Sequence, residues 1–197
     1  MQKIGFIGLG DMGIYMSKNL LKAGHMVKGF DVSQARLQQF AENGGVVCQS
    51  SAEVGRDIDV AIVMVVTGDQ VRSVLFGEHG LMESMAKGTT VIVTATIGTK
   101  PMMEIAAQAA EYGVNVVDCA VTGGQIGAEN ASLAMMVAAP KEVIDSCMNI
   151  LQVLGKTIVV AGDKAGMGQT VKNCNGVMSA LCTIATCEAM ALGVKAG

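Results

Sequence analysis

The sequence predicts an α/β protein: a Rossmann-type, doubly wound, mostly parallel sheet followed by one long helix. Short β-rich apolar runs alternate with helical patterns, which is typical of βαβ units with right-handed crossovers. Runs such as residues 60–66, VAIVMVV, are apolar on both faces, as strands buried between two helical layers must be. After Gly168 the chain follows a single helical pattern without proline.

The alternation of apolar runs and helical patterns predicts the elements in chain order. Strands are expected at Lys3–Ile7, Met26–Phe30, Asp59–Val65, Thr90–Val93, Val114–Asp118, Leu133–Ala138 and Thr157–Val160. The helices between them are expected at Met12–Ala23, Gln34–Glu42, Asp69–Phe76, Pro101–Tyr112 and Lys141–Leu154. The final helix is expected at Gln169–Lys195, so we divide the chain into a nucleotide-binding domain at 1–164 and a helical segment at 165–197.

The final helix is apolar around much of its circumference. A helix of this kind must be buried, and one Rossmann sheet can cover only one side of it. A second copy of the helix is the simplest cover for the other side, because two identical surfaces pair readily about a twofold axis. We therefore expect a homo-oligomer, a symmetric dimer, built through the C-terminal helix.

Composition excludes several classes of protein. Hydrophobic residues make up 51% of the chain and charged residues 16%, which argues against disorder. A net charge of −3 gives no electrostatic case for nucleic acid. We find no uncharged apolar run of about eighteen residues and no signal peptide, so we expect no membrane span. The six cysteines form no CxxC pair and predict free thiols in the cytoplasm, with no metal site.

A glycine fingerprint follows the first expected strand. Its residues are Gly8, Leu9, Gly10, Asp11, Met12 and Gly13, and they open the first helix. Gly8 permits a tight turn, Gly10 lets the backbone approach a pyrophosphate, and Gly13 allows close packing of helix on strand. Phosphates would meet free N–H groups and the positive end of the helix dipole. With a strand before it and a helix after it, this loop predicts dinucleotide binding.

An acidic residue, Asp31, ends the second expected strand, eighteen residues beyond Gly13. Its carboxylate can accept hydrogen bonds from both ribose hydroxyls and would repel a 2′-phosphate, which favours NAD over NADP as the cofactor. Alternatively Asp31 is a turn residue or a helix N-cap, although Ser33 could serve as that cap.

Lys172 is the best candidate for an acid/base. Both histidines lie in turns, so a lysine or carboxylate is favoured for taking the proton of an alcohol. Asn175 lies three residues on and shares a helix face with Lys172. Partial burial among Val171, Cys174 and Val177 would make the amine a usable acid or base. The alternative is a solvated lysine on an exposed helix.

A second unusual stretch, residues 118–128, leaves the carboxyl end of an expected strand, where ligands of such sheets bind. Thr122 offers a hydroxyl, and Gly123 and Gly124 offer unhindered backbone N–H groups for a carboxylate. The alternative is an ordinary glycine turn.

Taken together, three segments resemble the β-hydroxyacid dehydrogenase family. GFIGLGDMG with FDVS resembles its cofactor site, DCAVTGGQIGA its substrate signature and GMGQTVKNCNG its catalytic signature. The resemblance implies that Lys172 is the catalytic acid/base and Asn175 a substrate-binding residue. It implies that Thr122, Gly123 and Gly124 hold the substrate carboxylate, and it places Val65, Val66 and Thr96 at the cofactor.

The chain also departs from the family pattern near the substrate. Thr122 replaces a serine, Ala120 a proline and Ala95 the serine of an S-T pair, and Gly176 follows Asn175. The implied substrate is a small hydroxy acid: 3-hydroxyisobutyrate, tartronate semialdehyde or glycerate, or a four-carbon sugar acid such as threonate.

Family members carry a further all-helical C-terminal domain, so the final helix is expected to begin a domain that this chain otherwise lacks. We therefore expect the chain to bind NAD but to turn over slowly or not at all. Two alternatives to the NAD-dependent dehydrogenase stay open: a non-catalytic NAD-binding module or inactive fragment, and an imine or keto-acid reductase on the same architecture.

Overall fold

The computed structural model describes residues 1–197 and contains one eight-stranded sheet in the order β3-β2-β1-β4-β5-β6-β7-β8. The strands are β1 (Lys3–Ile7), β2 (Met26–Phe30), β3 (Val46–Val47), β4 (Val60–Val63), β5 (Thr90–Val93), β6 (Asn115–Thr122), β7 (Leu133–Ala138) and β8 (Gly155–Gly162). Every neighbouring pair is parallel except β6 and β7. Strands β1 to β3 are added outward on one side of the sheet and β4 to β8 outward on the other. The predicted doubly wound, mostly parallel sheet is therefore confirmed.

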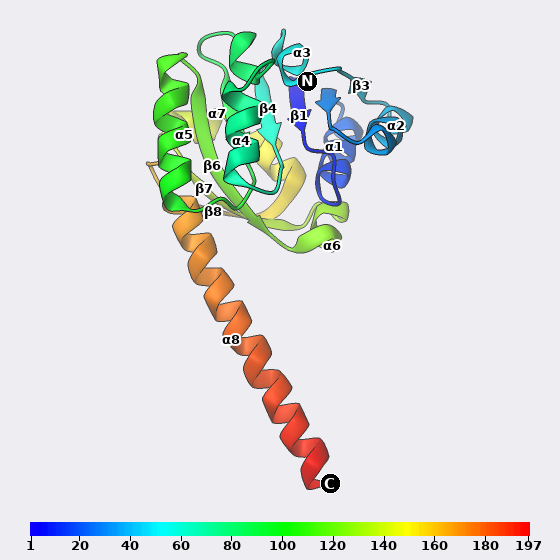
Figure 1. The fold of residues 1–197 in the computed structure, drawn as a ribbon, viewed down its shortest axis with the longest axis vertical. Helices are drawn as coiled ribbons and strands as arrows, with labels where there is room; N and C mark the ends of the chain where they lie inside the picture. Colours follow the sequence, from blue (N-terminus) through cyan, green and yellow to red (C-terminus); the bar gives the residue numbers. More distant parts are fainter.

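Helices cover both faces of this sheet (Figure 1). They are α1 (Gly13–Lys22), α2 (Gln34–Glu42), α3 (Ser51–Gly55), α4 (Gly68–Phe76), α5 (Thr99–Glu111), α6 (Gly124–Glu129), α7 (Lys141–Leu154) and α8 (Met167–Ala196), with a 3-10 helix, η1, at Leu81–Glu83. Buried side chains of α1, α2 and α7 form one core cluster with the sheet, and those of α4, α5 and η1 form the other. Two apolar layers therefore hold the strands, which explains why β4 and β5 are buried on both faces.

The elements that the sequence did not predict are short. β3 has two residues, α3 has five and α6 has six, so none carries a full helical or strand period. The Ser50 hydroxyl accepts a hydrogen bond from the Glu53 amide and caps α3, a local signal that the prediction overlooked.

β6 runs four residues beyond its expected end at Asp118. Residues 118–122 pair antiparallel with β7, from Asp118 opposite Ala138 to Thr122 opposite Ala134. This pairing extends β6 past the end of β5, where Val93 is opposite Asp118. The segment 119–122 is therefore strand rather than loop, and it carries Thr122 to the rim of the sheet.

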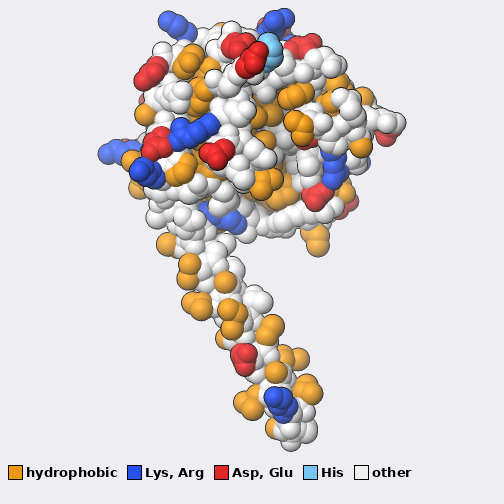
Figure 2. Space-filling model, viewed as in Figure 1, with side chains coloured by type: hydrophobic (Ala, Val, Ile, Leu, Met, Phe, Trp, Pro, Cys, Tyr) orange, Lys and Arg blue, Asp and Glu red, His pale blue; other side chains and the backbone are white.

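Helix α8 leaves the domain and projects into solvent (Figures 1 and 2). Only Gly168 and Gln169 are buried, so the sheet covers much less of this helix than the sequence suggested. Figure 2 shows hydrophobic side chains along the length of this helix. The exposed apolar residues of α8 include Val177, Met178, Leu181, Ile184, Met190 and Leu192.

By length and composition alone, α8 could also cross a membrane, with a mean hydropathy of 1.7 over its most apolar window. Lys172, Glu188 and Lys195 interrupt this apolar surface. A helix that packs against protein satisfies the same criterion. The dimer through α8 and the absence of a membrane span both stay predictions.

Candidate functional site

Most of the candidate residues lie at one edge of the sheet. Parallel strands bring their carboxyl ends together, and the register places Ile7 beside Phe30 and Val63, and Val63 beside Val93. The loops that follow these strands carry the glycine fingerprint, Asp31, Val65 with Val66, and Thr96. Ligands of open α/β sheets bind at this edge.

The three fingerprint glycines have different surroundings. Gly8 has a φ of +91°, and a Cβ there would lie 2.1 Å from the Met64 carbonyl oxygen. A Cβ on Gly13, the first residue of α1, would lie 1.9 Å from the Gly8 carbonyl oxygen. A Cβ on Gly10 would meet no atom within 4 Å. The chain therefore needs Gly8 and Gly13 for its own packing, whereas the space beside Gly10 is open to a ligand.

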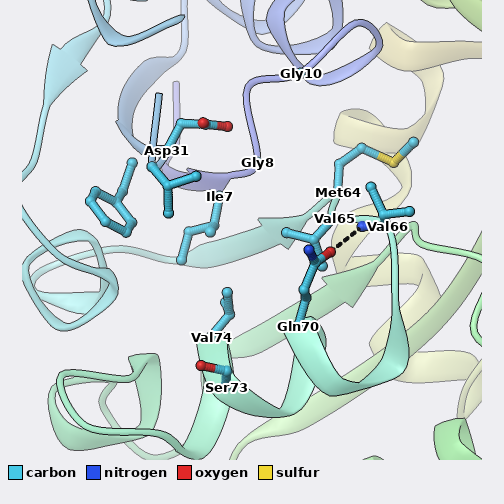
Figure 3. A pocket seen from close by; sticks show the side chains of 12 residues that line it. Ile7, Gly8, Gly10, Asp31, Met64, Val65, Val66, Gln70, Ser73 and Val74 are labelled. Carbon is cyan, nitrogen blue, oxygen red and sulfur yellow. Dashed lines mark hydrogen bonds between the residues drawn. The ribbon is translucent and has the colours of Figure 1, made fainter. Parts of the chain in front are cut away.

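A cleft of about 320 Å³ lies between this loop and α4 (Figure 3). It is lined by Ile7, Gly8, Gly10, Phe30, Asp31, Val32, Met64, Val65, Val66, Gln70, Ser73 and Val74. Its walls are mainly apolar, with one carboxylate at Asp31. That composition suits a flat, mostly apolar ring system attached to a group with hydroxyls.

The sequence analysis did not identify α4 as one wall of this cleft, which Gln70, Ser73 and Val74 line. The Gln70 side-chain oxygen accepts a hydrogen bond from the Val66 amide at 2.8 Å (Figure 3). It also accepts one from the Thr67 amide at 3.1 Å. The Thr67 hydroxyl in turn accepts one from the Gln70 amide, which completes a capping box. The capping-box sequence was a usable signal, and it explains why the backbone at Val66 is fixed.

Asp31 has a structural role besides lining the cleft. Its Oδ2 accepts a hydrogen bond from the Leu9 amide at 2.6 Å, and its Oδ1 accepts one from the Ser33 amide at 2.8 Å. The first bond ties the glycine loop to the end of β2, and the second forms a turn before α2. Ser33 occupies the N-cap position of α2 without a side-chain capping bond. A carboxylate has further acceptor positions, so Asp31 can also bind ligand hydroxyls.

The other loop residues do not line the cleft. The Leu9 side chain is fully buried in the core, which leaves only its backbone for the site. Asp11 forms an ion pair with Arg36 of α2. Met12 is partly buried against the core and precedes α1.

The second group of candidates lies on α8, in the loop after β5 and at the end of β6. Lys172 and Asn175 are half-buried on α8, and their neighbours Val171 and Cys174 are exposed. Thr96 is exposed in the loop after β5, and Thr122 is half-buried at the end of β6.

Gly123 and Gly124 follow Thr122 and are exposed at the start of α6. Their φ values are +125° and +59°, in the region where a side chain would strain the backbone. The turn therefore depends on glycine and leaves the backbone uncovered.

A buried pair that sequence reasoning did not identify joins these segments. Asp118 and Gln169 are both fully buried. Asp118 Oδ1 accepts a hydrogen bond from Gln169 Nε2 at 3.0 Å, and its Oδ2 accepts from the amides of Gly166 and Gln169 at 2.9 and 3.1 Å. Burial raises the pKa of the Asp118 carboxyl, and these hydrogen bonds act in the opposite direction. No periodicity marks such a pair, because its members lie 51 residues apart.

Comparison with known proteins identifies relatives that are dehydrogenases. Residues 3–162 match the family model of the NAD binding domain of 6-phosphogluconate dehydrogenase. A probable mitochondrial 3-hydroxyisobutyrate dehydrogenase of Dictyostelium discoideum is 37% identical over 194 residues, which cover 98% of this chain and 60% of the relative. An L-threonate dehydrogenase of Cupriavidus necator is 35% identical over 196 residues, which cover 100% of this chain and 66% of the relative.

A solved structure supports the same grouping. The 3-hydroxyisobutyrate dehydrogenase of Mycobacterium tuberculosis, studied with L-serine, superimposes with a TM-score of 0.94 at 35% identity. The match covers 100% of this chain and 66% of that protein. The chain therefore spans between 60% and 66% of the length of these relatives.

The contrast between Gly10 and Gly13 gives a matched pair of variants. We expect Gly13→Ala to lower the free energy of unfolding by about 1–3 kcal/mol or more, because its Cβ meets a carbonyl oxygen. Gly10→Ala should leave the unfolding free energy unchanged and weaken the binding of NADH, because its methyl group occupies the open space. Urea unfolding followed by circular dichroism and titration of NADH fluorescence measure the two effects. Equal NADH affinity in Gly10→Ala and the wild type would contradict this assignment.

Proposed function

The chain belongs to the β-hydroxyacid dehydrogenase family and carries its NAD-binding domain, and from this premise we propose that it transfers a hydride between NAD and a small hydroxy acid. The observation that carries the proposal is the set of hydrogen bonds made by Gln169. They hold the helix that bears Lys172 against the loop that bears Thr96, at the same sheet edge as the glycine loop.

The chain's residues fit a dinucleotide. The open space at Gly10 suits the pyrophosphate, and the first turn of α1 presents its backbone N–H groups there. The Asp31 carboxylate suits the ribose diol, and the apolar cleft beside Val65 and Val66 suits the adenine. The nicotinamide, when bound, accepts or returns the hydride. In this proposal Thr96 lies close to the reacting end of the cofactor.

Lys172 is the proposed acid/base. In oxidation its neutral amine takes the proton of the substrate hydroxyl, and in reduction its ammonium returns that proton. Asn175 lies on the same helix face and would hold the same hydroxyl in place. A lysine can serve in both directions because it gains and loses its proton within the reach of protein environments, whereas an arginine does not.

The rim formed by Thr122, Gly123 and Gly124 is the proposed carboxylate site. The threonine hydroxyl and the uncovered glycine backbone can donate hydrogen bonds to an anion. A substrate held there by its carboxylate would present a hydroxyl on a nearby carbon to Lys172. This arrangement favours hydroxy acids over simple alcohols.

A substrate panel tests the proposed reaction. We expect NADH to form, slowly because Lys172 is only half-buried on α8, with 3-hydroxyisobutyrate, L-threonate, L-serine or glycerate, and not with matched alcohols that lack the carboxylate. The absorbance of NADH at saturating NAD is the measurement. Equal turnover of alcohols and hydroxy acids would show that the carboxylate site is misplaced. NADH binding without turnover of any acid would instead indicate a non-catalytic NAD-binding module.

Asp31 predicts a preference for NAD over NADP. A phosphate close to this carboxylate is repelled by several kcal/mol at an effective dielectric constant of about 20, so NADH should bind at least about tenfold more tightly than NADPH. Asp31→Ala should narrow this difference in affinity, because it removes the repulsion of the 2′-phosphate and also removes the acceptor for the ribose hydroxyls and the Leu9 amide, which weakens NADH binding. Glu42→Gln, which removes one exposed acidic charge from α2, should leave the ratio of the NADH and NADPH affinities unchanged. Calorimetric titration of both cofactors checks this, and tighter NADPH binding by the wild type would refute it.

Lys172→Ala should lower kcat by a factor on the order of 10² or more while the dissociation constant of NADH barely changes, because a general acid/base contributes to the chemical step alone. Lys172→Arg should not restore kcat, because guanidinium does not lose its proton near neutral pH. Steady-state kinetics with the best acid of the panel provides the measurement. A near-normal kcat in Lys172→Ala would show that Lys172 is a solvated lysine without a role in proton transfer.

A further inference from the structure

The side chain of Gln169 uses all four hydrogen-bonding positions of its amide. Its Nε2 donates to the Ala95 carbonyl oxygen at 3.1 Å and to Asp118 Oδ1 at 3.0 Å. Its Oε1 accepts from the amides of Ile97 at 2.8 Å and Gly98 at 3.1 Å. Only a primary amide offers two donors and two acceptors in one plane, and asparagine, the other residue with this group, is one methylene shorter.

Asp118, the partner of Gln169, also binds the backbone at the start of α8. Its second carboxylate oxygen binds the amides of Gly166 and Gln169 at the start of α8, and so it caps this helix from a neighbouring strand. The approach requires glycine at 168, where a Cβ would lie 2.9 Å from the Asp118 carboxylate and 2.6 Å from the Met136 carbonyl oxygen. The start of α8 is therefore fixed on β6 by polar bonds as well as by packing.

The bonds of Gln169 join two segments that bear proposed active-site residues. Thr96 lies between Ala95 and Ile97, both of which bond to Gln169. Lys172 lies three residues beyond Gln169, less than one helical turn away. By contrast, no hydrogen bond joins Gln169 to the glycine loop or to Asp31. A change at Gln169 should therefore move Lys172 relative to Thr96 and leave the dinucleotide cleft intact.

We propose that Gln169, held by Asp118, is a positioning residue that sets Lys172 against the Thr96 loop. The inference rests on the proposed function of Lys172. The pair makes no contact with substrate in this proposal, and it acts by fixing the distance between the acid/base and the loop at the reacting end of the cofactor. Small misplacements of a reacting group have large kinetic costs, whereas they have little effect on cofactor binding elsewhere.

Four variants test the proposal. Gln169→Glu keeps the size of the side chain but places two carboxylates about 3.0 Å apart and loses the donor to Ala95. Asp118→Asn turns an amide donor toward the Gln169 donor, because the asparagine oxygen is needed for the two backbone amides. The double variant Asp118→Asn with Gln169→Glu pairs an amide donor with a carboxylate again. Gln152→Glu, on the exposed side of α7, is the control for the same chemical change.

We expect each single variant to lower kcat by about tenfold or more per NADH-binding molecule. The NADH dissociation constant should change much less than kcat, because the glycine loop and Asp31 make no hydrogen bond to Gln169. The double variant should recover part of kcat, so the two effects should be strongly non-additive. The recovery is partial because the Ala95 carbonyl oxygen still lacks its donor. Gln152→Glu should match the wild type. A pair that serves stability alone would lower the melting temperature and leave kcat per binding molecule unchanged, which would overturn the proposal.

Hydrogen exchange separates failure of this inference from failure of the proposed function. We expect Gln169→Glu to speed exchange across residues 95–98 and 166–172 and to leave residues 8–13 unchanged. If the wild type turns over no hydroxy acid, the proposed dehydrogenase function fails, and exchange then decides whether Gln169 fixes these segments. Unaltered exchange across residues 95–98 in Gln169→Glu would overturn the positioning role whatever the activity.

Discussion

The buried hydrogen bonds between Asp118 and Gln169 are the interaction on which the position of α8, and with it that of Lys172, depends. Elsewhere the domain is held by two apolar layers on a parallel sheet, and packing of that kind tolerates small shifts. A buried polar pair does not, because each unpaired donor or acceptor costs roughly 1–3 kcal/mol. The position of α8 relative to β6 is therefore defined by direction-specific bonds. These bonds determine where the whole helix lies, because α8 packs on the domain only at its start.

The two halves of the site are built on different physical principles. The dinucleotide half follows from the topology, since parallel strands deliver the glycine loop, Asp31 and residues 65–66 to one edge. Asp31 fixes the glycine loop through the Leu9 amide and also lines the cleft, so one carboxylate links the geometry of the loop to the wall of the cleft. The other half depends on a helix that is anchored by polar contacts and is otherwise exposed.

The exposed apolar surface of α8 bears on that second half. Lys172 and Asn175 are only half-buried, and residues such as Val177 and Leu181 further along the helix contact solvent. An acid/base works best in surroundings that exclude water, because electrostatic interactions are then stronger. Whatever covers α8 would therefore also complete the environment of Lys172.

The sequence by itself determined the sheet, the glycine loop and the identity of most candidate residues. These features leave local signals: apolar runs such as residues 60–63, glycines at fixed spacing, and an acidic residue at the end of the second strand. Only the tertiary structure decided the length of β6, the α4 wall of the cleft and the Asp118–Gln169 pair. Their partners lie far away in the chain, as Asp118 and Gln169 do across 51 residues. A periodic pattern reports which face of an element is apolar, but which distant polar groups meet is decided when the layers pack.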